Sequence, residues 1–187
     1  MPLFSFGKIN TGTVILVILA LLIYVYLRWL DKKEKSDKAV ALYRQYAVLT
    51  PQTLASLPDE EVLRAVIANL LAKADRRRPD LYTQLALLSR GQAAVYSVWL
   101  LCRESETADF PEIPAASRRF AEPAITGFSL LGAADCAAAL QALVTAFADG
   151  TVAPALSAAF RNAIALEQPL ALCLHYIREN PEEFCDL

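Results

Sequence analysis

The segment SRGQAAVYSVWLLC, residues 89–102, decides the fold of this chain of 187 amino acids. It opens with Ser89, followed three residues later by Gln92, which is the pattern of a capping box at the start of a helix. Residues 93–102 are apolar around the whole circumference of a helix, and ten residues are too few to span a bilayer. We therefore predict that this segment is the central, buried helix of a compact helical domain.

Helical periodicity extends from residue 51 to the C-terminus, and no run shows the two-residue alternation of a strand. Thr50 and Pro51 are typical of an N-cap and a first helical position, and Gly132 is typical of a helix end. Pro123 is expected to separate the helices on either side of it. Besides the central helix, we expect helices over residues 51–56, 58–74, 81–88, 115–120, 124–131, 133–148, 154–166 and 169–178. The predicted fold class is all-α.

Residues 123–148 contain a single charged residue, Asp135, and could instead form a membrane span. A carboxylate at the centre of a span costs about 2.5–3.5 kcal/mol on insertion scales. Gly127, Gly132 and Gln141 also weaken the apolar character of this stretch. We therefore expect two packed helices here rather than one span.

The N-terminal part of the chain contains one long uncharged stretch, residues 9–27. As a helix it would be about 28 Å long, close to the ~30 Å hydrocarbon core of a bilayer. A cleaved signal peptide would begin with basic residues and end with small ones, whereas bulky residues follow this stretch. We therefore predict a transmembrane anchor. The residues expected at its membrane interface, which are aromatic or basic, are Tyr24, Tyr26, Arg28, Trp29, Lys32 and Lys33.

The uneven distribution of charge predicts the orientation of this anchor. Residues 1–38 hold six basic and three acidic residues, a net charge of +3, and the remainder holds 12 basic and 17 acidic residues, a net charge of −5. Because basic residues collect on the cytoplasmic side, we expect a short outer tail and a cytoplasmic C-terminal domain. The i,i+4 pair Glu34 and Lys38 indicates that the helix continues as a charged stalk to about Leu49. The predicted parts are a tail with anchor (1–30), a stalk (31–50) and a helical domain (51–187).

Few residues are suited to catalysis. The one histidine, His175, precedes Glu179 by four residues, and we interpret it as a surface residue paired with that glutamate.

The four cysteines are Cys102, Cys136, Cys173 and Cys185. Their spacings match no zinc-binding pattern, and the first three occupy apolar helix positions. We expect no cofactor, no metal and no catalytic residue. An enzyme of unrecognised type that uses Cys102, Glu104 or His175 stays open as an alternative.

Carboxylates cluster in the loop that follows the central helix. Glu104, Glu106, Asp109 and Glu112 lie within nine positions, around Phe110. The spacing and turn glycine of a calcium-binding loop are absent, so we interpret the cluster as a solvated acidic loop or a partner-binding edge. We select these five residues as the candidate partner-binding site. Because the net charge of the body is negative, nucleic acid is not an expected partner.

Three stretches of the body resemble one known family. Residues 89–104 (SRGQAAVYSVWLLCRE), 128–140 (FSLLGAADCAAAL) and 176–184 (YIRENPEEF) are similar to segments of the DNA-mimic-protein-like family of bacterial helical domains. The resemblance covers roughly residues 57–184. The family follows its central helix with an Asn-Gly-Gly-Phe loop, of which this chain keeps Phe110. The resemblance implies an all-α protein without catalytic activity that acts through protein contacts.

These features together predict a membrane-tethered, non-enzymatic interaction domain that faces the cytoplasm. Its expected partners are the lipid bilayer and a protein, which could be a second copy of the chain. A subunit of a larger membrane complex is the alternative that shares the same anchor.

Overall fold

The computed structural model describes residues 24, 28, 33–34, 37–38, 40–74 and 81–186, and every regular element among them is helical. The all-α fold class is confirmed for this part of the chain. The chain divides into two units, residues 1–44 and 45–187. None of the helices in the described ranges is long and apolar enough to cross a bilayer. The predicted anchor, residues 9–27, lies outside those ranges except for Tyr24.

The first unit contributes isolated helical positions and the start of the segment 40–45. Lys38 Nζ lies 2.6 Å from Glu34 Oε1, which confirms the i,i+4 pair predicted for the stalk. Arg28 donates a hydrogen bond to the hydroxyl of Tyr24 over 3.5 Å. Lys33 is also exposed and helical. The other predicted interface residues, Tyr26, Trp29 and Lys32, lie outside the described residues.

The helix that leads into the second unit ends at Gln45, earlier than the predicted Leu49. The side-chain amide of Asn69 donates to the carbonyls of Tyr46 (3.0 Å) and Ala47 (3.2 Å), just beyond the helix end. These hydrogen bonds satisfy carbonyl groups that have no intrahelical donor. Tyr46 and Leu49 are buried, so the chain turns into the core at this point.

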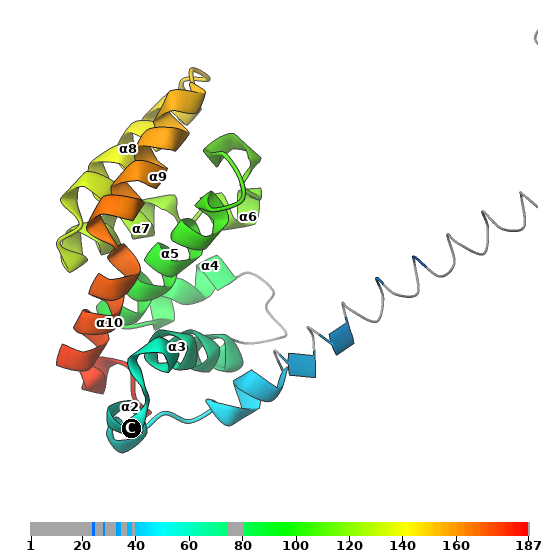
Figure 1. Cartoon of the computed structure of the whole chain (residues 1–187), viewed down its shortest axis with the longest axis vertical. Helices are drawn as coiled ribbons and strands as arrows, with labels where there is room; N and C mark the ends of the chain where they lie inside the picture. Colours follow the sequence, from blue (N-terminus) through cyan, green and yellow to red (C-terminus); the bar gives the residue numbers. More distant parts are fainter. Residues whose placement is uncertain are drawn as a thin grey trace, which may run out of the picture. The chain divides into compact units, whose positions relative to one another are not determined.

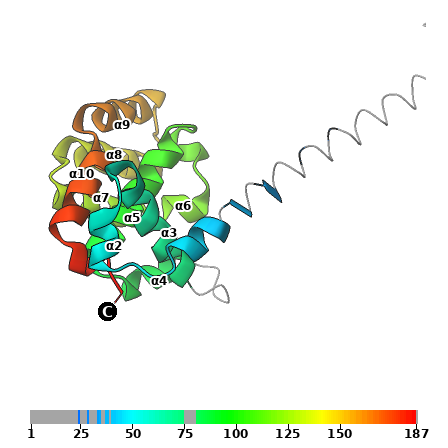
Figure 2. The same ribbon diagram turned by 60° about the horizontal axis from the view of Figure 1, so that its bottom comes forward.

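The second unit is a bundle of short helices around α5 (Figures 1 and 2). Its elements are α2 (Pro51–Ser56), α3 (Asp59–Lys73), α4 (Leu81–Gln84), η1 (Leu85–Leu87), α5 (Arg90–Ser105), η2 (Phe110–Glu112), α6 (Ala115–Arg118), α7 (Ala121–Leu131), α8 (Ala134–Ala148), α9 (Pro154–Glu167), α10 (Pro169–Glu179) and η3 (Pro181–Glu183). α5 packs against α6, α7, α9 and α10, and α10 also packs against α3. α8 and α9 form a hairpin that packs onto α7 through α8 (Figure 1).

α5 is the central buried helix that the sequence predicts, with Ser89 as its N-cap and three further residues at its C-terminal end. The capping box is present, since Ser89 Oγ accepts from the N–H of Gln92 and Gln92 Oε1 accepts from the N–H of Ser89, both over 3.1 Å. The side chains along its length are largely removed from water. Each buried valine or leucine stabilises the fold by roughly 1.5–3 kcal/mol. Gly127 of α7 permits the close approach of the two helices, because a Cβ there would lie 3.0 Å from the carbonyl oxygen of Ala94.

Pro123 does not interrupt a helix, contrary to the prediction. It lies in the first turn of α7, where the backbone N–H has no intrahelical acceptor and its loss costs little. Gly132 ends α7 with a φ of 82°, as predicted. Residues 123–148 therefore form most of α7 and all of α8, two packed helices, which confirms the prediction over the alternative of a single span.

Candidate functional site

The predicted partner-binding loop joins α5 to α6, and it is held in place by Asp109 of the loop and by Glu104, which lies in the last turn of α5. Asp109 Oδ1 lies 2.6 Å from Arg161 Nη1 of α9. Glu104 accepts a hydrogen bond of 3.0 Å from the hydroxyl of Ser117 in α6. Asp109 is also the N-cap of η2, in a box with Glu112. These carboxylates therefore help to fix the conformation of the loop.

Phe110, which we selected as a partner-binding residue, is a core side chain that is only 4% exposed. Its ring packs edge-on against Phe147 of α8 with centroids 5.7 Å apart. Its N–H donates to the hydroxyl of Ser157 in α9 over 3.2 Å. Phe110 therefore fastens the loop to the α8–α9 hairpin. On the outer side of the loop, Glu106 and Glu112 are exposed.

A cleft of about 300 Å³ lies beside this loop, between α6, the start of α7, and α8. Phe147 forms part of its wall and keeps 41% of its surface exposed. The guanidinium carbon of Arg118 lies 4.8 Å from the centroid of the Phe147 ring. Arg118 Nη1 also donates to the carbonyl of Pro111 over 2.7 Å. An exposed aromatic side chain beside an apolar cleft and charged groups is the usual composition of a protein interface.

The three residues considered for an unrecognised enzyme activity, Cys102, Glu104 and His175, lie in different local environments. His175 is 70% exposed, and its Nε2 lies 3.1 Å from Glu179 Oε1, which confirms the predicted pair. Cys102 is buried, and burial raises the pKa of its thiol, helped by Cys173 and the Glu106 carboxylate. Glu104 is bonded to Ser117. Within the described ranges, no group of His, Cys, Asp and Glu side chains is arranged to hold a metal ion.

Cys136 and Cys173 are buried like Cys102, as predicted, and all four cysteines of the chain are free thiols. Burial raises the pKa of Cys173 to about 12 and also raises that of Cys136, where the Glu167 carboxylate contributes. Glu167 caps α8 by accepting from the N–H groups of Asp135 (3.0 Å) and Cys136 (2.7 Å). Burial alone would raise the pKa of Glu167, but these hydrogen bonds outweigh it and lower the pKa.

A second groove, of about 290 Å³, lies between α3, η1 and the start of α5. Its wall is mainly leucine, and Lys73, Gln84, Gln92 and Tyr96 add polar atoms. Leu87 is part of the wall and is 82% exposed.

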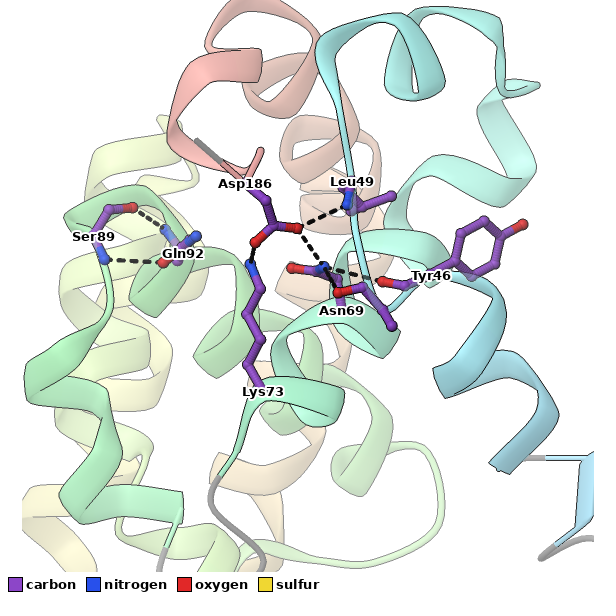
Figure 3. Close-up of polar contacts among 8 residues, drawn as sticks. Tyr46, Leu49, Asn69, Lys73, Ser89, Gln92 and Asp186 are labelled. Carbon is purple, nitrogen blue, oxygen red and sulfur yellow. Dashed lines mark hydrogen bonds and ion pairs between the residues drawn. The ribbon is translucent and has the colours of Figure 1, made fainter.

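Asp186 connects Lys73 of this groove to the point where the chain enters the second unit (Figure 3). Its Oδ2 accepts from the N–H of Leu49 (2.8 Å) and the amide of Asn69 (3.2 Å), and its Oδ1 pairs with Lys73. The N–H of Asp186 donates to the carbonyl of Leu49 over 2.8 Å. Burial alone would raise the pKa of Asp186, but Lys73 and the two N–H donors outweigh it and lower the pKa. We call these four residues the Asp186 clasp.

Sequence reasoning missed the clasp, although one signal was available. Asn69 interrupts the apolar stripe that Val62 and Val66 form on the predicted helix 58–74. A polar residue at such a position indicates a buried hydrogen-bonding group. Its partner Asp186, which lies 117 residues further along the chain, had no local signal.

Comparison of the chain with protein families, with curated proteins and with solved structures gives no match. The resemblance to the DNA-mimic-protein-like family therefore stays a prediction.

Proposed function

We propose that this chain is a membrane-tethered, non-enzymatic helical domain that faces the cytoplasm and binds a protein partner. Phe147 carries the proposal, because it exposes 41% of an aromatic side chain beside an apolar cleft. Aromatic side chains, phenylalanine among them, are enriched in protein–protein interfaces relative to the rest of the surface. The uncharged stretch 9–27 would supply the tether.

The binding surface proposed here, the loop–cleft surface, consists of Glu106, Glu112, Arg118 and Phe147. Glu106 and Glu112 are exposed acidic groups of the predicted loop, whereas the neighbouring Glu104 and Asp109 are engaged with Ser117 and Arg161. A partner that fits this surface would place an apolar side chain on Phe147 and basic groups near the two glutamates. The proposal thus keeps Glu106 and Glu112 from the sequence prediction and adds Arg118 and Phe147 in place of Glu104, Asp109 and Phe110.

Cross-linking of the tagged full chain in its native host, followed by purification in detergent, tests this function. Phe147→Ser and Glu106→Lys should each lower the recovery of cross-linked partner by roughly tenfold, the effect of losing about 1.4 kcal/mol of binding energy. Leu166→Ser and Glu182→Lys are the matched controls, because both residues are exposed away from the surface. They should leave recovery unchanged.

Equal recovery from all four variants would contradict the assignment of the loop–cleft surface. Loss of the chain from the membrane fraction would contradict the tether instead. The two parts of the proposal can therefore fail separately.

A further inference from the structure

Arg118, the last residue of α6, is held in a fixed position without an acidic partner. Its Nη1 donates to the carbonyl of Pro111 over 2.7 Å and also to the carbonyl of Ile113. Its guanidinium carbon lies 4.8 Å from the centroid of the Phe147 ring. None of the ion pairs among the described residues includes Arg118. A guanidinium that contacts two neutral carbonyls and a ring keeps its full positive charge.

This charge lies in the wall of an apolar cleft. Arg118 is half-buried and lines the cleft of about 300 Å³ together with Phe147 and Val144. Its Nη2 and Nε donate to no acceptor within the described part of the chain. A guanidinium edge can bind a carboxylate through two parallel hydrogen bonds. The cleft is therefore complementary to an apolar side chain with a carboxylate beside it.

Two further charged side chains line the cleft, Arg119 and Glu122, and both are exposed. Arg119 lies over the ring of Tyr82, with 4.5 Å between the guanidinium carbon and the ring centroid. Glu122 would repel a second acidic group of a ligand. The charges of the cleft therefore favour a single carboxylate over an acidic stretch.

The loop beside the cleft favours an acidic side chain over the carboxylate at the end of a chain. Terminal carboxylates are captured by backbone N–H groups that point together at one spot. The loop residues 109–113 all donate their N–H groups to acceptors within the chain, apart from Pro111, which has none. The backbone groups that Arg118 contacts are carbonyls, which repel a carboxylate. An acidic side chain can reach the guanidinium while its own backbone stays outside the cleft.

We infer that the loop–cleft surface binds a partner segment in which an aspartate or glutamate lies close to an apolar residue. The apolar side chain packs on Phe147 in the cleft, and the carboxylate pairs with Arg118. Arg118 thus determines specificity, whereas Phe147 supplies apolar contact area. The inference rests on the proposed function and adds the chemical group that is recognised.

The test selects random peptides, displayed between fixed flanking sequences, on the purified full chain in mild detergent. We expect the enriched peptides to contain one aspartate or glutamate near an aromatic or long aliphatic residue. Synthetic copies with the corresponding amide in place of this acid should bind about tenfold more weakly. This comparison uses the unaltered chain, so it does not depend on the folding of a variant.

A variant then assigns the preference to one side chain. Arg118→Gln should bind the acid and amide peptides equally, because it lacks the guanidinium. Arg103→Gln is the matched control and should keep the preference. Arg103 is exposed and also lies over a ring, that of Trp99 at 5.5 Å, but it does not line the cleft.

The inference would be overturned if no peptide were enriched, if enriched peptides lacked an acid, or if the acid preference persisted in Arg118→Gln. It would also be overturned if N-acetyl-phenylalanine, whose carboxylate is terminal, competed better than the acid peptides. Partner recovery from the native host distinguishes the two proposals. If recovery falls in Phe147→Ser but the peptides show no acid preference, only the inference fails. If the preference holds but recovery is unchanged in Phe147→Ser, the proposed function fails.

Discussion

Asp186 shows how one carboxylate near the end of the chain satisfies several buried polar groups. It accepts hydrogen bonds from Leu49 and Asn69 and pairs with Lys73. Asn69 in turn donates to the carbonyls of Tyr46 and Ala47, which follow the last residue of the stalk helix. Removing the Asp186 carboxylate would leave the N–H of Leu49 without its acceptor and Lys73 without its ion-pair partner, and an unpaired buried polar group costs about 1–3 kcal/mol.

Asp186→Asn should therefore lower the free energy of unfolding by about 1–3 kcal/mol at pH 7. Folding lowers the pKa of Asp186. The stability that its ionised carboxylate contributes is therefore present above the ordinary pKa of an aspartate, and it is lost as the pH falls through the pKa of Asp186 in the folded state. The difference from the wild type should thus shrink below about pH 4. Urea unfolding of the full chain in mild detergent over this pH range measures both effects. Asp149→Asn, at an exposed helix end, is the control. If the Asp186→Asn variant were as stable as the wild type at pH 7, the stabilising role of the clasp would be disproved.

The cysteines should differ sharply in reactivity. Cys102, Cys136 and Cys173 are buried, and burial raises the pKa of each thiol, so little reactive thiolate forms. Cys185 is only half-buried, although burial and the Asp186 carboxylate raise its pKa as well. Mass spectrometry after maleimide treatment should find one modified thiol in the native chain and four after denaturation. Rapid modification of two or more thiols in the native chain would contradict this packing.

At the scale of helices, the start of α5 is held both by its own first residues and by residues near the C-terminus of the chain. Ser89 and Gln92 form the local capping box. Glu183 adds a carboxylate that accepts from the N–H of Gly91 over 2.9 Å. Tyr176 of α10 donates to the same carboxylate over 2.9 Å, so the C-terminal helices depend on this contact as well.

Gly91→Ala should destabilise the chain, although alanine favours a helix over glycine by about 1 kcal/mol. A Cβ at this position would overlap Glu183 Oε2 and lie 2.7 Å from Tyr176 Cε1. We expect a loss of about 1–3 kcal/mol in thermal or urea unfolding, as for other overpacked sites. The control is Ala138→Gly on the exposed face of α8, which measures helix propensity alone. An increase in stability for Gly91→Ala would show that Glu183 does not occupy this position.

Two of the contacts that hold the loop with η2, one apolar and one ionic, differ greatly in strength. Phe110→Ala should cost about 3–5 kcal/mol, because it empties a buried aromatic site. Arg161→Gln should cost less than about 1 kcal/mol, because its pair with Asp109 is partly exposed. Hydrogen exchange over residues 106–113 should increase in both variants, and global stability should fall only in Phe110→Ala. Equal losses of stability in the two variants would contradict this account of the loop.

Elements with local signals could be predicted from the sequence. The capping box at Ser89, the cap at Thr50 and the helix end at Gly132 each depend on neighbouring residues. Contacts between distant residues could not be predicted, such as Asp186 to Leu49 across 137 positions or Glu167 to Cys136 across 31.

The same distinction applies to the candidate site. The sequence located the acidic loop, but its spacing could not show which carboxylates are paired or that Phe110 points into the core.

For the whole molecule, the proposed loop–cleft surface joins residues of the loop with η2, of α6 and of α8, all within the second unit. The tether proposed for residues 9–27 is a separate part of the account, and each can fail without the other.

Thiol labelling in intact cells tests most directly whether the chain is tethered with its body in the cytoplasm. Cys185 is the reporter, and Ser5→Cys in the predicted outer tail is the positive control. We expect a membrane-impermeant maleimide to modify Ser5→Cys in intact cells and to modify Cys185 only after the membrane is permeabilised. The chain should also stay in the membrane pellet after alkaline carbonate. Modification of Cys185 in intact cells, or release of the chain by carbonate, would contradict the account.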